Sequence, residues 1–405
     1  MELTPSEADL SGPTIRDSTA PEGLHFHYAD EAKPLATPWQ VAVERAKMVR
    51  KCSLPKGIIL DPACGSGIQL AAYCAMMGRE GIGIELDEST AHAANSNLLR
   101  VSNHGYDSAL ADSRIRIGDG TITDPTLKVA MLHLDPARPR NSRTHGIDEM
   151  NPKLDEIFSA WKGQLIEGDM GPAILLDLSP RLTNEQRLEV ESIVETFWPG
   201  IGKTWAWTSR GRGRIDRLSL WLGQLSSTQN ENRFVRIPPE LKNKPVVVQG
   251  ETLPISAHRR PPRKGEHVSI LDAALVESGL ATVFLNQTLP EQEITWSVAT
   301  GRRPQIHHPS PFSFDDKNQS LLVQATGRIV KLVHCELTEE TIPRLVDAAI
   351  EYGFGKLTLR VSLDPELQPR LQGSIDRQLT ARGGSHTGFV AQQPGDSMLL
   401  LCLIS

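Results

Sequence analysis

The stretch that decides the fold of the first half of the chain is Ile58-Ile-Leu-Asp61-Pro62-Ala-Cys-Gly65-Ser66-Gly67-Ile-Gln. An apolar run ends in an acid, a glycine-rich turn follows, and a helical pattern begins near Ile68. This order predicts a buried strand, a tight loop and a helix N-terminus, which together begin a βαβ unit. The two glycines allow the backbone of the loop to approach a ligand closely.

The residues of this loop favour a positively charged ligand over a pyrophosphate. A dinucleotide-binding loop has a third glycine, and Leu70 stands at its place. Asp61 at the strand end suits S-adenosylmethionine, which carries an amino group and a sulfonium and has no phosphate. Taken alone, the stretch leaves a second interpretation open, an ordinary strand–turn–helix whose acid only caps the turn.

Composition describes a soluble globular protein of more than one domain. The chain has 405 residues, of which 39% are hydrophobic and 23% charged, and its formal net charge is −6. This length predicts two or three domains. The negative charge excludes a global basic field for nucleic acid, although a local basic patch stays possible.

The spacing of the cysteines and the composition of the N-terminal residues predict a cytoplasmic protein without a structural metal. The five cysteines are scattered and show no CxxC or zinc-ligand spacing, which is typical of a reducing compartment. The polar, acidic residues 1–19 do not form a signal peptide. No apolar run approaches the length of a membrane span.

Acids follow the next predicted strands in the same way. Strand 81–87 contains Glu85, at the distance from the glycine loop where an acid accepts hydrogen bonds from ribose hydroxyls. Strand 114–117 is followed by Asp119, which can accept a hydrogen bond from an adenine amino group. The alternatives are that Glu85 is a solvated strand end or a helix cap, and that Asp119 is a turn residue.

Strand 129–134 leads into Asp135-Pro136-Ala137-Arg138, and strand 173–176 ends at Asp177. Ligands of open α/β sheets bind beyond the carboxyl ends of the strands, so Asp135 is expected in the same crevice as the earlier acids. Strands are also predicted at 203–207 and 217–222. The arginines between them, Arg210, Arg212 and Arg214, either meet phosphates or form a solvated loop.

The pattern also predicts how the chain is divided. Residues 1–24 are polar and are expected to be a disordered tail. Residues 25–228 form the α/β domain, and a helix begins at Thr37 and Pro38, a favourable cap and first residue. Residues 229–310 are expected to be a linker or connecting segment. Residues 311–405 alternate strands and helices and predict a small α+β domain.

At this point the residues resemble a known family. The first half is similar to the class I S-adenosylmethionine-dependent methyltransferases. The whole chain resembles archaeal and bacterial proteins of that class that end in a THUMP-like domain. The matching stretches are Ala36-Thr37-Pro38 with Val41-Ala42 and Arg45-Ala46, Asp61 with Gly65-Ser66-Gly67, Asp135-Pro136-Ala137-Arg138, residues 271–280, residues 309–312 and residues 352–359.

The resemblance implies an α/β fold, a Rossmann-like seven-stranded methyltransferase domain followed by a smaller α+β THUMP-like domain. It implies S-adenosyl-L-methionine as cofactor and a base in RNA, tRNA or rRNA, as substrate. We expect neither a membrane nor a metal as partner. The cofactor-binding residues would be Asp61, Ala63, Gly65 and Gly67 for the methionine end, Glu85 for the ribose and Asp119 for the adenine.

Asp135, Pro136 and Arg138 would form the catalytic stretch, in which Asp135 orients or deprotonates the acceptor. Methyltransferases of exocyclic amines carry two prolines and an aromatic residue after this strand. Here Ala137 and Arg138 follow instead, so an amine target is less favoured, although an arginine can stack on a base or hold a phosphate. Two alternatives stay open: an inactive RNA-binding protein that retains the fold, and a small-molecule methyltransferase.

Overall fold

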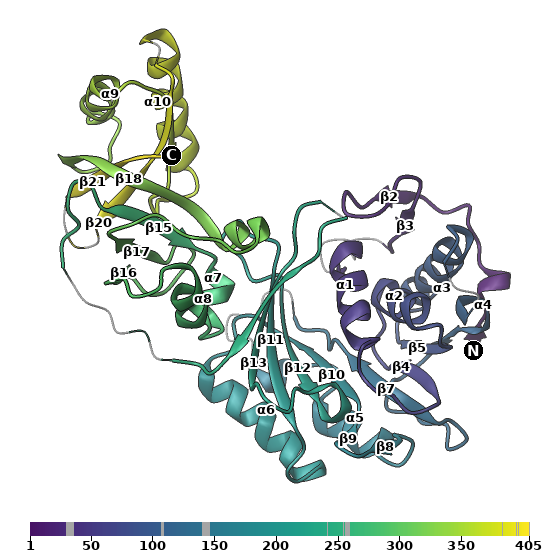
Figure 1. Ribbon diagram of the computed structural model, residues 1–405. Coiled ribbons are helices and arrows are strands. Elements are labelled where there is room, and N and C mark those ends of the chain that lie inside the picture. Colours follow the sequence, from purple (N-terminus) through teal and green to yellow (C-terminus); the bar gives the residue numbers. More distant parts are fainter. Residues whose placement is uncertain are drawn as a thin grey trace. The chain divides into compact units, whose positions relative to one another are not determined.

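The computed structural model describes residues 1–29, 36–106, 109–139, 146–240, 242–253, 255, 260–382, 384–393, 395 and 397–404. The chain forms two compact units (Figure 1). The first unit comprises residues 1–206, 217–231 and 239–244, and the second comprises residues 207–216, 232–238 and 245–405. Within the described ranges, no helix is long and apolar enough to cross a membrane.

A largely parallel sheet forms the centre of the first unit. Its parallel strands are β4 (Ile58–Asp61), β5 (Gly81–Glu85), β6 (Arg114–Ile117), β7 (Val129–Leu134) and β10 (Ile174–Leu178). They lie in the order β6-β5-β4-β7-β10, followed by the antiparallel β12 (Arg217–Leu222) and then β11 (Lys203–Ser209). The strand order reverses between β4 and β7, and such a switch point is where ligands bind in α/β sheets. Each of the seven strands predicted from the sequence is present, but within the described residues the sheet has ten strands rather than seven.

Helices follow the strands of the first unit. They are α1 (Trp39–Val49), α2 (Ile68–Met77), α3 (Glu88–Asn103), α4 (Ala109–Asp112), α5 (Leu154–Trp161) and α6 (Asn184–Phe197). Figure 1 shows α1, α2 and α3 on one side of the sheet and α5 and α6 on the other. Apolar residues of α1, α2 and α3 share one core with Ile59, Met131 and Leu175, which the neighbouring strands β4, β7 and β10 present to the same face. Two short strands, β8 (Glu167–Gly168) and β9 (Gly171–Pro172), pair as a hairpin.

Residues 1–24 differ from the expected disordered tail. Strand β1 (Glu2–Leu3) pairs antiparallel with β6, and Glu2 forms ion pairs with Arg114 and Arg116 on that strand. Strands β2 (Thr14–Arg16) and β3 (His25–His27) pair with each other. The polar segment is ordered because β6 would otherwise leave its backbone groups unpaired at the sheet edge, and composition does not reveal that edge.

The start of α1 also differs in detail. Pro38 is the N-cap residue, and the backbone N–H of Trp39 donates to Asp17 from the N-terminal segment at 2.7 Å. The hydroxyl of Thr37, expected to cap the helix, accepts a hydrogen bond from Arg217 at 2.8 Å.

The second unit contains a seven-stranded mixed sheet in the order β16-β17-β15-β18-β21-β20-β19. Its strands are β15 (His267–Leu271), β16 (Thr295–Val298), β17 (Gln305–His308), β18 (Val323–His334), β19 (Phe354–Leu359), β20 (His386–Gln393) and β21 (Met398–Leu403). Its helices are α7 (Ala273–Glu277), α8 (Ala281–Thr288), α9 (Ile342–Glu351) and α10 (Leu367–Arg382), and a further pair of strands is β13 (Asn232–Arg236) and β14 (Val246–Gly250).

Strand β21 shows why this sheet is stable. Leu399 and Leu401 belong to a core with α9 and α10, whereas Leu400 and Cys402 belong to a second core on the opposite face. An apolar run therefore serves both faces of a buried strand. Strand β18 also pairs with β15, so residues 267–308, expected to lie in a linker, belong to the same sheet as residues 323–403. The expected boundary at residue 310 is not present.

Candidate cofactor and acceptor site

Four acids named from the sequence meet at one edge of the first unit. Asp61 is the last residue of β4 and Glu85 the last of β5, while Asp119 and Asp135 follow β6 and β7. These strands are parallel neighbours, so their carboxyl ends lie side by side. The structure thus brings the predicted acids to one edge of the sheet, with Asp61 and Asp135 at the switch point itself.

The two glycines of the loop after β4 have different surroundings. Both have positive φ angles, 51° for Gly65 and 69° for Gly67. No atom lies within 4 Å of a Cβ built on Gly65, whereas one on Gly67 would lie 3.0 Å from Cβ of Ala94 on α3. Gly65 therefore leaves open space for a ligand. Gly67 is the N-cap of α2 and allows that helix to pack closely on α3.

Glu85 fixes the shape of the loop. Its carboxylate accepts hydrogen bonds from the backbone N–H groups of Gly65 and Asp87, each at 3.0 Å. Burial raises the pKa of Glu85, and these two N–H groups oppose the shift. A carboxylate has about four lone-pair positions, so Glu85 keeps acceptor capacity for a ligand.

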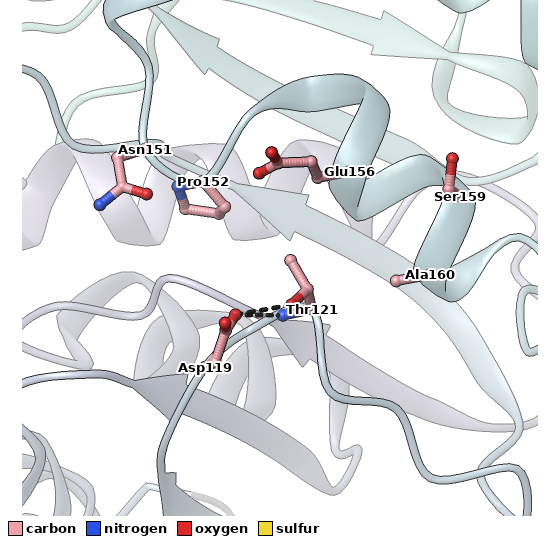
Figure 2. Close-up of a pocket in the computed structure, with 7 residues that line it drawn as sticks. All are labelled: Asp119, Thr121, Asn151, Pro152, Glu156, Ser159 and Ala160. Atoms are coloured by element: carbon pink, nitrogen blue, oxygen red, sulfur yellow. Dashed lines mark hydrogen bonds between the residues drawn. The ribbon is translucent and has the colours of Figure 1, made fainter.

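Asp119 lies exposed at the mouth of a cleft (Figure 2). Its Oδ1 accepts from both the backbone N–H and the hydroxyl of Thr121 at 2.8 Å, and these bonds hold its pKa below the usual range. Among the described residues, none donates a hydrogen bond to Oδ2 of Asp119. Across the cleft, Asn151 and Pro152 precede α5 and Glu156 projects from it; the lining residues are Asp119, Thr121, Asn151, Pro152, Glu156, Ser159 and Ala160.

Asp61 is only 1% exposed and belongs to a buried polar network that the sequence did not reveal. Its Oδ2 lies 2.7 Å from Nδ1 of His133 on β7, and Nε2 of the same ring lies 3.2 Å from Oδ2 of Asp177 on β10. Arg45 of α1 binds both oxygens of Asp177, at 2.7 and 2.6 Å, and also contacts Gln69 of α2. The Oδ1 of Asp61 accepts from the backbone N–H of Ala63 at 3.3 Å.

The charges of this network shift the pKa values of its members. Burial lowers the pKa of His133, but Asp61 and Asp177 outweigh burial and raise it to about 9. Burial would raise the pKa of Asp177, but Arg45 and His133 hold it well below its usual range. One signal in the sequence points to the network: a histidine inside an apolar central strand, with an acid ending the strands on either side.

Asp135 and Arg138 lie next to this network. Burial and the charge of Asp177 raise the pKa of Asp135, against the opposing cations Arg217, His133 and Arg138. Burial lowers the pKa of Arg138, whose Nε and Nη2 are buried and have no hydrogen-bond partner among the described residues. Pro136 between them is buried. The stretch therefore contains a carboxylate with a raised pKa beside unused guanidinium donors.

The arginines between residues 210 and 214 belong to the second unit, as do two neighbouring histidines. Arg210 pairs with Asp216 at 2.9 Å, whereas Arg212 and Arg214 are exposed. The paired histidines His307 and His308 are buried in β17. Across the described ranges, no group of three or more His, Cys, Asp or Glu side chains is arranged to hold a metal ion.

No family model and no curated protein matches the chain. Among solved structures, it is similar to a candidate methyltransferase from Porphyromonas gingivalis W83. That match has 16% identity and a TM-score of 0.61, and it covers 93% of this chain and 82% of that chain.

Two shorter structures also match. Precorrin-6y C5,15-methyltransferase from Geobacter metallireducens GS-15 has 11% identity and a TM-score of 0.33, and the match covers 49% of this chain and 93% of that one. Precorrin 8W decarboxylase from Methanobacterium thermoautotrophicum has 15% identity and a TM-score of 0.33, with coverage of 52% and 98%. The match to the Porphyromonas protein extends over nearly the whole chain, and the chain therefore shares its α/β fold with that protein.

Proposed function

We propose that this protein is an S-adenosylmethionine-dependent methyltransferase that modifies a base in RNA, either tRNA or rRNA. One observation carries the proposal: Asp61, Glu85, Asp119 and the open space at Gly65 meet at the switch point of a methyltransferase-type sheet. Ligands of such sheets bind at this edge.

The chemistry of the loop fits this cofactor better than a dinucleotide. The backbone N–H of Gly65, which a phosphate would need, is already bonded to Glu85. The carboxylate of Glu85, which holds that N–H, would also repel a phosphate. An amino group, a sulfonium and ribose hydroxyls instead match the available acceptors.

We assign the parts of the cofactor along the edge of the sheet. Asp61, Ala63, Gly65 and Gly67 form the loop for the methionine end, with Gly65 supplying the space. Glu85 would accept from the ribose hydroxyls. Asp119 would accept from the adenine amino group through Oδ2, because Oδ1 already holds Thr121.

When bound, S-adenosylmethionine supplies a methyl group on a sulfonium, already activated for displacement. Asp135 would hold the acceptor in line with that group and take its proton, and its raised pKa suits a general base. Arg138 would use its unpartnered donors on the base or its phosphate. Pro136 keeps the segment between them rigid.

Exposed arginines in the second unit support a nucleic-acid substrate. Arg212, Arg214 and Arg302 are exposed and have no ion-pair partner within the described residues. A Cβ on Gly213 would lie 2.6 Å from the backbone oxygen of Arg302, so the two arginine-bearing loops are adjacent. Phosphate contacts of this kind position a nucleic acid without reading its sequence.

Calorimetry with the full chain tests cofactor binding. We expect micromolar affinity for S-adenosylmethionine, about −8 kcal/mol. Glu85→Ala should weaken binding by roughly 1.5–3 kcal/mol, because charge-assisted hydrogen bonds are lost. Glu88→Ala, an exposed acid in the first turn of α3, is the matched control. Absence of binding by the wild-type chain would refute the proposal.

The second candidate function is an inactive RNA-binding protein, and the altered Ala137-Arg138 stretch is the observation that favours it. The variant Asp135→Asn distinguishes this candidate from an enzyme. The substrate RNA is identified first, by mass spectrometry of the modified nucleosides in RNA from cells with and without the protein. If Asp135 is catalytic, turnover on that RNA should fall about 10²-fold, while cofactor affinity and Tm hardly change. If the wild-type protein methylates no RNA but binds it, the binding protein becomes the better interpretation. Methylation of small molecules only would favour the third candidate.

A further inference from the structure

We propose that His133 is a positioning residue: its ring is held as an imidazolium between Asp61 and Asp177 and ties the cofactor loop to the neighbouring strands. The part concerning the cofactor rests on the proposed function. The protonation state of the ring does not, because it follows from the protein alone.

The bridge spans three adjacent strands. His133 lies on β7, between β4, which ends in Asp61, and β10, which carries Asp177. Leu60 pairs with Leu132, so Asp61 and His133 are the next residues along their strands. The three side chains are at most 2% exposed, so water does not compete for these contacts.

Both ring nitrogens face carboxylate oxygens. A neutral imidazole can donate through only one nitrogen, and an ionised carboxylate can only accept. Asp61, Asp177 and both ring nitrogens of His133 all have hydrogen-bond partners only if the ring carries both protons. The charges then balance, because two buried carboxylates meet the imidazolium and the guanidinium of Arg45.

One aromatic ring and charged groups of both signs surround this cluster. Tyr73 of α2 lies edge-on to His133 with the ring centroids 5.3 Å apart, and its hydroxyl has no hydrogen-bond partner in the described structure. The charged groups that act on this cluster are Asp61, Asp177 and Asp135 on the acidic side, and Arg45, Arg217 and Arg138 on the basic side. The acids contact or flank the ring directly, whereas the arginines bind or face the acids.

The bridge has a consequence for the site. Asp61 is two residues before Ala63, where the cofactor loop begins, and Asp177 holds Arg45 of α1. Deprotonation of His133 would leave one carboxylate facing a lone pair, so that Asp61 would lose its fixed orientation. Cofactor affinity should therefore be constant around neutral pH and fall as the pH rises through about 9.

Nitrogen-15 NMR of the histidine-labelled full chain tests the protonation state directly. We expect two ring N–H signals for His133 at pH 7.5, assigned by their loss in His133→Gln, and a titration midpoint well above 6.5. Asp177→Asn should lower this midpoint by a unit or more. A neutral tautomer at pH 7.5 in the wild-type protein would overturn the proposal.

Cofactor titrations between pH 6.5 and 10 test the positioning role. His133→Gln should weaken S-adenosylmethionine binding by at least tenfold at pH 7.5 and remove the decline above pH 8. His92→Gln, in which the lost ring is half exposed on α3, is the matched control. If His133→Gln does not fold, the wild-type and Asp177→Asn profiles decide: their midpoints must follow those of the NMR titration.

A failure of the positioning role of His133 can be distinguished from a failure of the proposed function. If the ring titrates as expected but the wild-type chain does not bind S-adenosylmethionine, the proposed function is wrong and the imidazolium bridge stands. If the cofactor binds and its affinity shows no decline through the titration of His133, the positioning role is wrong and the proposed function stands.

Discussion

Two buried histidines, one in each unit, have opposite electrostatic environments. His133 on β7 lies between two carboxylates, which raise its pKa to about 9. His308 on β17 contacts the hydroxyl of Ser269 and the backbone oxygen of Ser310, and burial lowers its pKa to about 4. Burial acts against the charged form in both rings, so the neighbouring groups decide whether a buried histidine is a cation or a neutral ring.

The largest effect is expected from breaking the ion pair next to His133. Arg45→Met removes the cation that binds both oxygens of the buried Asp177, and it should cost roughly 3–5 kcal/mol in the free energy of unfolding. The double variant Arg45→Met/Asp177→Leu should recover part of this loss. Arg382→Met removes an exposed ion pair with Asp347 in the second unit and should change stability little. Denaturant titrations provide the three values, and an equal loss in single and double variants would contradict the pairing.

The pH dependence of the first unit should follow His133. Its pKa is raised from 6.5 to about 9 on folding, so its contribution is fully present below pH 6.5 and is lost as the pH rises through 9. The loss should amount to roughly 3 kcal/mol. Hydrogen exchange of the β7 amides between pH 6 and 10 measures it, after correction for the intrinsic exchange rate. The slope should be absent in His133→Gln.

The second unit should respond with the opposite sign. The pKa of His308 falls from 6.5 to about 4 on folding, so its contribution is present above pH 6.5 and is lost as the pH falls through 4. The loss should be at most about 3 kcal/mol. Hydrogen exchange of the β17 amides is compared between the wild type and His308→Gln. The difference separates the contribution of His308 from that of the carboxylates that titrate in the same pH range. Equal pH slopes in the two variants would show that His308 is already charged in the folded unit.

The smallest effect should come from an exposed acid of the same edge. Asp119→Asn keeps an oxygen acceptor for the Thr121 bonds to Oδ1. It replaces Oδ2, the acceptor proposed for the adenine amino group, with an amide nitrogen that only donates. We expect an unchanged Tm and a several-fold loss of S-adenosylmethionine affinity, about 1 kcal/mol, measured by calorimetry. A lower Tm would mean that Asp119 is mainly a turn residue.

The sequence by itself determined the strands of the first unit and the acids that follow them. Strand β4 ends at Asp61 and α2 begins at Ile68, as predicted, and β6 and β7 have the predicted bounds before Asp119 and Asp135. These features are local, because strand, turn and helix depend on residues close together in the chain.

Only the tertiary structure decided the partners of the buried charges and the extent of the units. His133 meets acids 72 and 44 residues away, and Arg45 meets Asp177 across 132 residues. The order of residues 1–24 and the joining of residues 267–308 to the second sheet likewise depend on distant strands. The pairing and register of strands joined by long crossovers are not visible in any local pattern, because they result from packing the whole sheet.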